Sequence, residues 1–302
     1  MSDQSKKKKS TSAQKAKNTL RKNSVISISG KGFHRIAYRD WGRVKSPETV
    51  FCLHGLTRNA YDFDNLAKVL SVNRRVICPD IVGRGNSDWL PSHEDYNLPQ
   101  YNLDIAVLAA KTARNSNGVF DLIGTSLGGL MGIILASMQN SPVKRLVIND
   151  IAPEVPYSAL KRLSQYLGED PFFDNLVQAE AYLREKYAPF SPMSDKNWRR
   201  MTKHSTRKSG DGFRLAYDPA ISENYRRYWL LMYFSLWNYW DKINCPVLIL
   251  RGKESDFLTE PLLSRMTDAL PHADVVEFDG VGHTPSLNSA EQINSIVNWL
   301  NK

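Results

Sequence analysis

The sequence contains few cysteines and no long apolar run. Its 302 residues include only Cys52, Cys78 and Cys245, and none of them belongs to a CxxC pair or has His or Asp at metal-ligand spacing. An odd number of cysteines in apolar, strand-like runs argues against a disulfide framework, so we expect three core side chains, no metal and a reducing, cytoplasmic location. No apolar segment approaches the roughly 20 residues that span a bilayer, and we therefore expect no transmembrane helix.

Little net charge remains beyond the N-terminus. The formal net charge is +9, but residues 1–22 carry +7 and leave only +2 for the rest of the chain. Residues 1–22 are rich in Lys, Ser, Thr and Gln, which predicts a disordered basic tail, and no apolar segment follows the lysines as it would in a secretory signal. Such a tail could contact anionic lipid or RNA weakly, although a solubilising extension is the simpler interpretation. The near-neutral remainder gives no reason to expect specific nucleic-acid binding.

Short apolar runs alternate with segments of helical periodicity. Two alternating runs, 25–29 and 33–39, are typical of half-exposed antiparallel strands. Six mostly apolar runs are typical of parallel strands covered on both faces: 50–53, 75–78, 119–123, 146–149, 247–250 and 275–278. Helical segments are expected at 61–70, 101–112, 127–138, 260–270 and 290–300. This alternation predicts an α/β protein with a mostly parallel, doubly wound sheet.

One connection is far longer than the usual loop between strand and helix. Residues 151–243 contain no convincing β-run, and six prolines divide them into short helical segments. We interpret them as a helical cap inserted into a core made of residues 23–150 and 244–302. The second half of this cap is aromatic: Trp198, Phe213, Tyr217, Tyr225, Tyr228, Trp229, Tyr233, Phe234, Trp237, Tyr239 and Trp240. These rings could line a substrate cavity or only attach the cap to the core.

A glycine-flanked serine is the strongest chemical signal in the chain. Gly124-Thr125-Ser126-Leu127-Gly128 follows an apolar strand and opens a helix, which is the context of a nucleophile elbow. The turn is so tight that a side chain at either glycine would collide with neighbouring backbone. We therefore predict that Ser126 is a nucleophile whose hydroxyl is held above the edge of the sheet.

A serine nucleophile needs a base, and the base needs an acid to orient it. His283 is the predicted base, because it follows the strand at 275–278 in a loop whose glycines, Gly280 and Gly282, let it bend back toward the sheet edge; His34, His93, His204 and His272 are expected to be surface residues. Asp256 follows the strand at 247–250 and is the predicted acid. Asp150 also follows a strand and is the main alternative, unless it bonds backbone N–H groups near the start of the cap.

The negative charge that develops on a substrate carbonyl needs two N–H donors. The backbone N–H of Leu127 stands at a helix N-terminus beside Ser126. His54-Gly55 follows a strand directly, so the N–H of Leu56 is the expected second donor, while His54 itself could only brace the turn. No cofactor is needed for this chemistry.

Together these residues resemble the α/β-hydrolase superfamily over about residues 25–300. The elbow at 124–129, the His54-Gly55 loop, the Asp-x-x-Gly-x-Gly-x-Ser turn at 80–87, Asp256 and Gly282-His283 carry the resemblance. It implies the α/β-hydrolase fold and a cofactor-independent serine hydrolase. Haloalkane dehalogenases and epoxide hydrolases fit poorly, since their pattern has aspartate at the position of Ser126.

The expected activity is hydrolysis of small to medium hydrophobic carboxylic esters through an acyl-serine intermediate. Cleavage of C–C bonds or lactones by the same triad is an alternative, as is a catalytically silent ligand-binding protein of this fold. The sequence leaves the physiological substrate and the oligomeric state open.

Overall fold

A computed structural model describes residues 19–187, 191–223 and 235–302 of the chain. Residues 1–18, which make up most of the predicted basic tail, lie outside the described residues. So do five of the cap aromatics, at positions 225, 228, 229, 233 and 234. Within the described part, no helix is long and apolar enough to cross a membrane.

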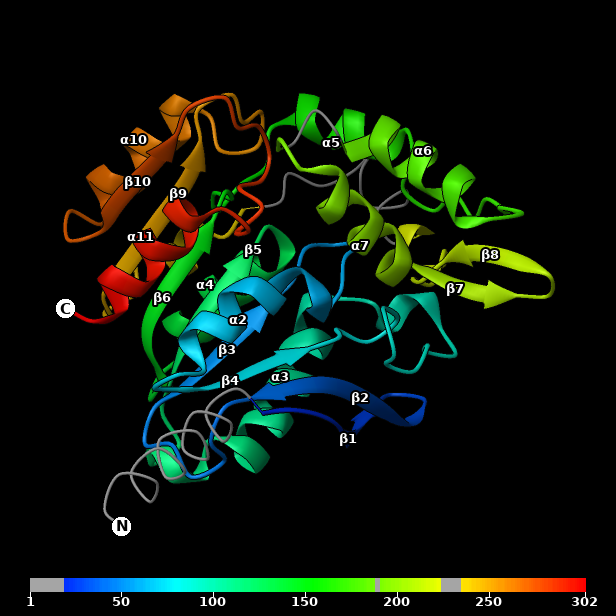
Figure 1. Ribbon diagram of the computed structural model, residues 1–302. Coiled ribbons are helices and arrows are strands. Elements are labelled where there is room, and N and C mark those ends of the chain that lie inside the picture. Colours follow the sequence, from blue (N-terminus) through cyan, green and yellow to red (C-terminus); the bar gives the residue numbers. More distant parts are fainter. Residues whose placement is uncertain (1–18, 188–190, 224–234) are drawn as a thin grey trace, which may run out of the picture.

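An eight-stranded sheet forms the centre of the protein, with strand order β1-β2-β4-β3-β5-β6-β9-β10 (Figure 1). The strands are β1 Leu20–Ser29, β2 Gly32–Trp41, β3 Thr49–Leu53, β4 Arg75–Pro79, β5 Phe120–Thr125, β6 Val143–Asn149, β9 Val247–Gly252 and β10 Asp274–Phe278. The β1–β2 and β2–β4 pairs are antiparallel, and all other neighbours are parallel. The predicted mostly parallel sheet is confirmed.

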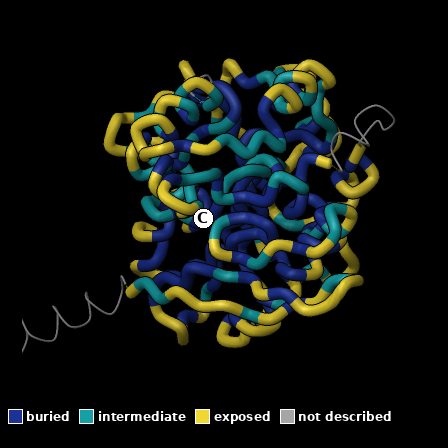
Figure 2. Tube along the Cα trace, turned by 90° about the vertical axis from the view of Figure 1, so that its right-hand side faces the viewer, coloured by how far each residue is buried: buried dark blue, intermediate teal, exposed yellow. Residues whose placement is uncertain are grey.

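Helices cover both faces of this sheet, because the side chains of each strand alternate between two cores. Phe51 and Leu53 of β3 pack in the core that contains residues of α3 Leu98–Thr112, α4 Leu127–Ser137 and α10 Glu260–Ala269. Val50 and Cys52 pack in the core that contains α2 Asp64–Leu70 and α11 Ala290–Leu300. β3 and β9 are accordingly buried along their whole length, and Figure 2 shows the buried residues gathered in the interior of the molecule. The described part of the chain also has three short 3-10 helices in its loops: η1 Ala60–Phe63, η2 His93–Asp95 and η3 Arg114–Ser116.

The N-terminal hairpin corrects two expectations. β1 begins at Leu20, so residues 20–22 belong to the sheet and not to the tail. Arg21 at this position donates to both carboxylate oxygens of Asp40, at 3.3 and 2.9 Å, which gives its charge a structural partner. His34 is not a surface residue: it is buried on the inner face of the hairpin, with Nε2 2.9 Å from Asp104 Oδ1.

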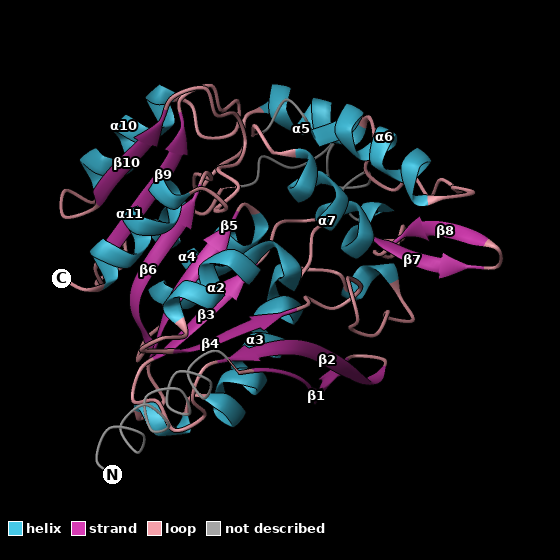
Figure 3. Ribbon diagram, viewed as in Figure 1, coloured by secondary structure: helices cyan, strands magenta, loops and turns pink. Residues whose placement is uncertain are grey.

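Residues 151–243 form the connection between β6 and β9; their first three described helices lie over the sheet edge at which β5, β6 and β9 end (Figure 3), and the fourth packs on α4. These helices are α5 Tyr157–Ser164, α6 Leu176–Tyr187, α7 Asp195–Ser205 and α9 Trp237–Trp240. The expectation of a purely helical cap is wrong, because β7 Thr206–Ser209 and β8 Gly212–Leu215 pair as an antiparallel hairpin. Of the described aromatics, Trp198, Tyr217, Trp237 and Trp240 are buried, whereas Tyr239 is exposed.

Candidate active site

Ser126 occupies a sharp turn between β5 and α4. Its backbone has φ 50° and ψ −112°, a conformation that is rare for a residue with a side chain. The flanking glycines are required by close approach of the backbone: a Cβ at Gly124 would lie 2.2 Å from the carbonyl oxygen of Gly128, and a Cβ at Gly128 would lie 2.1 Å from that of Leu53. The turn therefore holds the serine hydroxyl above the ends of the parallel strands.

His283 connects this serine to a carboxylate. Its Nε2 lies 3.1 Å from Ser126 Oγ, and its Nδ1 lies 2.7 Å from Oδ2 of Asp150. An ionised carboxylate can only accept, so Nδ1 carries the proton and Nε2 is free to accept from the serine hydroxyl. Ser126, His283 and Asp150 are thus joined by a continuous series of hydrogen bonds.

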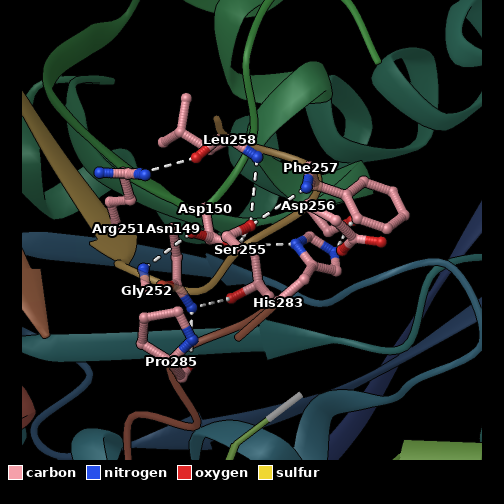
Figure 4. Close-up of polar contacts among 12 residues, drawn as sticks. Asn149, Asp150, Arg251, Gly252, Ser255, Asp256, Phe257, Leu258, His283 and Pro285 are labelled. Carbon is pink, nitrogen blue, oxygen red and sulfur yellow. Dashed lines mark hydrogen bonds and ion pairs between the residues drawn. The ribbon is translucent and has the colours of Figure 1, made fainter. Parts of the chain in front are cut away.

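Asp150 is fully buried but has a complete set of donors. Oδ1 accepts from the N–H of Gly252 at 2.9 Å, and Oδ2 accepts from Ser255 Oγ at 2.6 Å as well as from His283. Figure 4 shows these groups gathered where β6 and β9 end. A buried carboxylate without such donors would be strongly unfavourable. The contacts therefore fix Asp150 in place beneath the imidazole.

Asp256, the predicted acid, does not contact His283. Its carboxylate faces outward and binds the guanidinium of Arg162 on cap helix α5, with both N–O distances 2.8 Å. The cause is the turn after β9, in which Ser255 Oγ points inward and accepts from the N–H groups of Phe257 and Leu258 at 3.2 and 3.1 Å. As a result, the side chain of Ser255 points toward Asp150 and that of Asp256 points toward the cap.

The residue after Asp256 covers the imidazole. The Phe257 ring stacks on His283 with 3.8 Å between centroids and 14° between the planes. Arg162, held by Asp256, places its guanidinium carbon 5.5 Å from the centroid of the same phenyl ring. Residues 255–257 thus contact Asp150, Arg162 of the cap and His283 in turn, and Figure 4 shows this loop beside Asp150 and His283.

The two expected oxyanion donors lie in the same cavity as Ser126. Leu127 is the first residue of α4, and Leu56 lies in the loop after β3; both line the cavity. Neither N–H donates to a protein acceptor within the described part of the chain. The buried Arg84 donates to the carbonyl oxygen of Leu56 at 2.8 Å and so holds this peptide in place.

The loop that carries Leu56 is braced by the turn after β4. Nδ1 of His54 donates to Gly55 O at 2.8 Å, and Nε2 accepts from the N–H of Ile81 at 2.9 Å. Burial lowers the pKa of His54 to about 3, so the ring stays neutral and can make both contacts. Asp80 accepts from the N–H of Ala60 at 2.8 Å and completes the attachment.

The remaining histidines lie away from Ser126. Nδ1 of His93 lies 3.4 Å from a carboxylate oxygen of Glu223, and His272 is exposed. His204 is half-buried and stacks on Tyr61, with its pKa lowered to about 4 mainly by burial. Over the described ranges, no group of three or more His, Cys, Asp or Glu side chains is placed to hold a metal ion. The three cysteines have no disulfide partner.

A cavity of about 180 Å³ opens in front of Ser126 and His283. Most of its wall is apolar and comes from α4, the start of the cap and the loops after β9 and β10: Leu130, Ile151, Val155, Leu160, Leu163, Phe257 and Leu287. One side is more polar and includes Thr57, the Arg58–Asp62 pair, Tyr166 and Tyr187. The cavity can therefore hold a small, largely apolar molecule beside the serine.

Comparison with known proteins agrees with this geometry. Residues 48–290 match the family model described as alpha/beta hydrolase fold. The chain belongs to the alpha/beta hydrolase family. The fold and the resemblance inferred from the sequence are thereby confirmed.

Relatives of this alpha/beta hydrolase are hydrolases with named substrates or activities. It is 36% identical over 277 residues to a 3-hydroxybutyrate-oligomer hydrolase of Cupriavidus necator, covering 89% of this chain and 94% of the relative. It is 28% identical over 233 residues to an esterase of Mycobacterium tuberculosis, covering 73% and 70%. An alpha/beta hydrolase structure from Novosphingobium aromaticivorans superposes with a TM-score of 0.80 at 31% identity, covering 95% and 99%. The protein is a hydrolase of this fold that acts on a small molecule.

Three contributors to the site have no clear signal in the sequence. Ser255 and Phe257 flank the predicted acid, but nothing local tells which residue of that loop faces the imidazole. Arg84 stands inside the Asp-x-x-Gly-x-Gly-x-Ser turn, so that motif marks its region without indicating its bond to the Leu56 carbonyl.

Proposed function

We propose that this alpha/beta hydrolase cleaves small to medium hydrophobic carboxylic esters through an acyl-serine intermediate. The observation that carries the proposal is the continuous hydrogen bonding from Ser126 through His283 to Asp150. Asp150 takes the role of the acid in this proposal, in place of Asp256. The esterase among the relatives supports the same reaction class.

In the first half of the reaction, Nε2 of His283 takes the proton of Ser126 as Oγ attacks the ester carbonyl carbon. The carbonyl oxygen becomes an anion and accepts from the N–H groups of Leu56 and Leu127, which contribute most when charge develops. The imidazolium is stabilised by Asp150 and returns its proton to the leaving alcohol. The carbonyl reforms and leaves an acyl group on Ser126.

In the second half, water attacks the acyl carbon while His283 takes a proton from it. The same two N–H groups stabilise the second tetrahedral anion. Its collapse releases the carboxylic acid, and the proton on the imidazole returns to Ser126 Oγ. No step requires a cofactor.

The cavity and one relative narrow the choice of substrates. The apolar wall formed by α4 and the cap suits a short acyl or alcohol group. The relative from Cupriavidus necator is named for 3-hydroxybutyrate oligomers, which are chains of short hydroxy acids joined by esters. We include such oligoesters, with simple alkyl esters, among the substrates that this chain hydrolyses.

A serine-directed phosphonate and a panel of chromogenic short-acyl esters test the proposal. We expect labelling at Ser126 and ester turnover, both lost in Ser126→Ala and retained in Ser164→Ala, which changes an exposed cap serine. Labelling without turnover of any ester would instead favour C–C or lactone cleavage. An absence of labelling would favour a binding protein.

We propose a cytoplasmic location, which suits three cysteines that have no disulfide partner. Weak contact of the basic N-terminus with an anionic surface is a separate proposal, supported only by the charge of residues 1–22. Sedimentation with anionic vesicles or RNA at two salt concentrations tests it. Equal retention of the full chain and of a chain lacking residues 1–18 would rule out the contact.

A further inference from the structure

A tyrosine hydroxyl in the cavity wall has no hydrogen-bond partner among the described residues. Tyr166 follows α5 and lines the cavity in front of Ser126, and only 8% of it is exposed. Its hydroxyl makes no hydrogen bond with any residue of the described ranges, and the oxygen is accessible from the cavity. Burial raises the pKa of this phenol, so the hydroxyl stays protonated and can both donate and accept.

The hydroxyl groups of three neighbouring tyrosines all have hydrogen-bond partners. Tyr182 donates to Glu169 Oε2 at 2.6 Å, Tyr217 to the carbonyl oxygen of Glu169 at 3.1 Å, and Tyr187 shares a 2.6 Å hydrogen bond with Thr57. A hydroxyl that opens onto a cavity can bond to water or to a polar group of a ligand. Tyr166 is therefore poised to bond to a group that enters the cavity.

Tyr166 lies on the side of the cavity that adjoins the loop of Leu56, the proposed oxyanion donor. Thr57 follows Leu56, the proposed oxyanion donor, and its hydroxyl holds Tyr187. Tyr187 in turn packs edge-on against Tyr166, with ring centroids 5.9 Å apart. The free hydroxyl thus belongs to the wall that adjoins the oxyanion loop, where it can meet one arm of an ester bound to Ser126.

The charges of that wall favour a neutral ligand group. Among the described residues of the lining there is one permanent cation, Arg58, and it is paired with the one carboxylate, Asp62, through Nε at 2.9 Å and Nη2 at 2.5 Å. Arg58 also donates to Ser205 Oγ at 2.9 Å. Because these charges cancel and the guanidinium is already engaged, no described residue of the lining offers an unpaired cation to a carboxylate.

We propose that Tyr166 binds a neutral oxygen, either a hydroxyl or a second ester carbonyl, carried by one arm of the substrate. The site thereby selects oxygen-bearing short esters over plain alkyl esters and over esters with a free carboxylate. A site that offers a hydrogen bond discriminates against the analogue that lacks the matching group. This inference rests on the proposed ester hydrolysis.

Four esters test the inference with the full-length protein. Ethyl butyrate is the plain reference, ethyl 3-hydroxybutyrate adds a hydroxyl to the acyl arm, 2-hydroxyethyl butyrate adds one to the alcohol arm, and monoethyl succinate carries a carboxylate. We expect a roughly three- to tenfold higher kcat/KM for one hydroxylated ester than for ethyl butyrate, the size of one hydrogen bond. Monoethyl succinate is expected to be the poorest substrate.

The variant Tyr166→Phe removes only the free hydroxyl, and we expect it to bring that ratio to about one. Tyr182→Phe is the matched control: it removes a hydroxyl that is bonded to Glu169 and should keep the wild-type ratio. Circular dichroism checks that both variants fold. If Tyr166→Phe does not fold, the preference of the wild type for a hydroxylated ester over ethyl butyrate remains as a second test.

Two results would overturn this inference and leave the proposed ester hydrolysis intact. One is hydrolysis by the wild type without preference for either hydroxylated ester, and the other is a preference that persists in a folded Tyr166→Phe variant. If the wild type hydrolyses none of the four esters and no other ester, the proposed function fails and this inference fails with it.

Discussion

The phenyl ring of Phe257 lies almost parallel to the imidazole of His283, 3.8 Å away between centroids. The neighbouring Asp256 holds Arg162 of the cap, and Ser255 holds Asp150. Three consecutive residues therefore contact Asp150, the cap and His283. Any movement of the cap relative to the core must be accommodated by the loop that packs against the base.

Replacement of Phe257 with leucine tests the importance of this packing. Leucine keeps an apolar side chain but removes the flat surface that restricts rotation of the imidazole. An aromatic pair of this kind contributes about 0.5–1.5 kcal/mol, so we expect kcat to fall by roughly two- to tenfold. Steady-state kinetics on a short-acyl ester measures the effect.

Phe173→Leu is the control for loss of a buried ring. Phe173 packs on Tyr182 in the cap, with centroids 5.4 Å apart, and it does not line the cavity. The Phe173→Leu variant should have a lower free energy of unfolding than the wild type but the same kcat. Equal kcat values for Phe257→Leu and the wild type would show that the stacking does not position His283.

The second glycine of the elbow, Gly128, admits no side chain. A Cβ at Gly128 would lie 2.1 Å from the backbone oxygen of Leu53, which cannot move without distorting β3. We expect Gly128→Ala to cost about 3 kcal/mol or more in the free energy of unfolding and to abolish turnover. Urea unfolding measures this cost.

The comparison variant is Gly30→Ala, because the nearest atom to a Cβ there is 3.9 Å away. Its effect on unfolding should stay within about 0.5 kcal/mol. If Gly128→Ala were as stable and as active as Gly30→Ala, the tight approach of the elbow to β3 would be refuted.

The neutral, buried His54 predicts a loss of stability in acid. Its pKa is about 3 in the folded protein, because of burial, and about 6.5 in an unfolded chain. Below pH 6.5 the unfolded chain therefore binds a proton that the folded protein does not, and the free energy of unfolding falls as pH falls. Between about pH 7 and pH 5 this residue accounts for a loss of about 2 kcal/mol.

Urea unfolding of the wild type and of His54→Gln at these two pH values measures the contribution. We expect the variant to be less stable at neutral pH, since it disturbs the contact with Ile81, but to lose about 2 kcal/mol less on acidification. Identical losses for the two proteins would contradict the buried, neutral state of His54.

The sequence predicts those parts of the site that depend on local backbone. The elbow is a five-residue pattern with its strand and helix beside it, so Ser126 could be recognised without any long-range contact. His283 could be recognised from its place after the last strand of the sheet. The oxyanion loop was predicted from the strand before it.

The acid could not be chosen in this way. β6 and β9 are parallel neighbours, so Asp150 and the loop that carries Asp256 emerge at the same edge of the sheet. Which carboxylate meets the imidazole depends on the inward turn of Ser255, a tertiary contact that no local pattern encodes. The cap hairpin was missed for a related reason: residues 206–209 are all polar and show no alternation.

The most direct test of the central claim compares Asp150→Asn with Asp256→Asn. Each substitution removes one charge and keeps the shape of the side chain. We expect Asp150→Asn to lower kcat on a short-acyl ester by about 10³–10⁴-fold, because an amide can no longer hold the Nδ1–H of His283.

Asp256→Asn breaks only a partly exposed ion pair with Arg162, and we expect kcat to stay within about threefold of the wild type. This measurement decides the assignment of the acid. A collapse of kcat in Asp256→Asn, with activity retained in Asp150→Asn, would contradict the account.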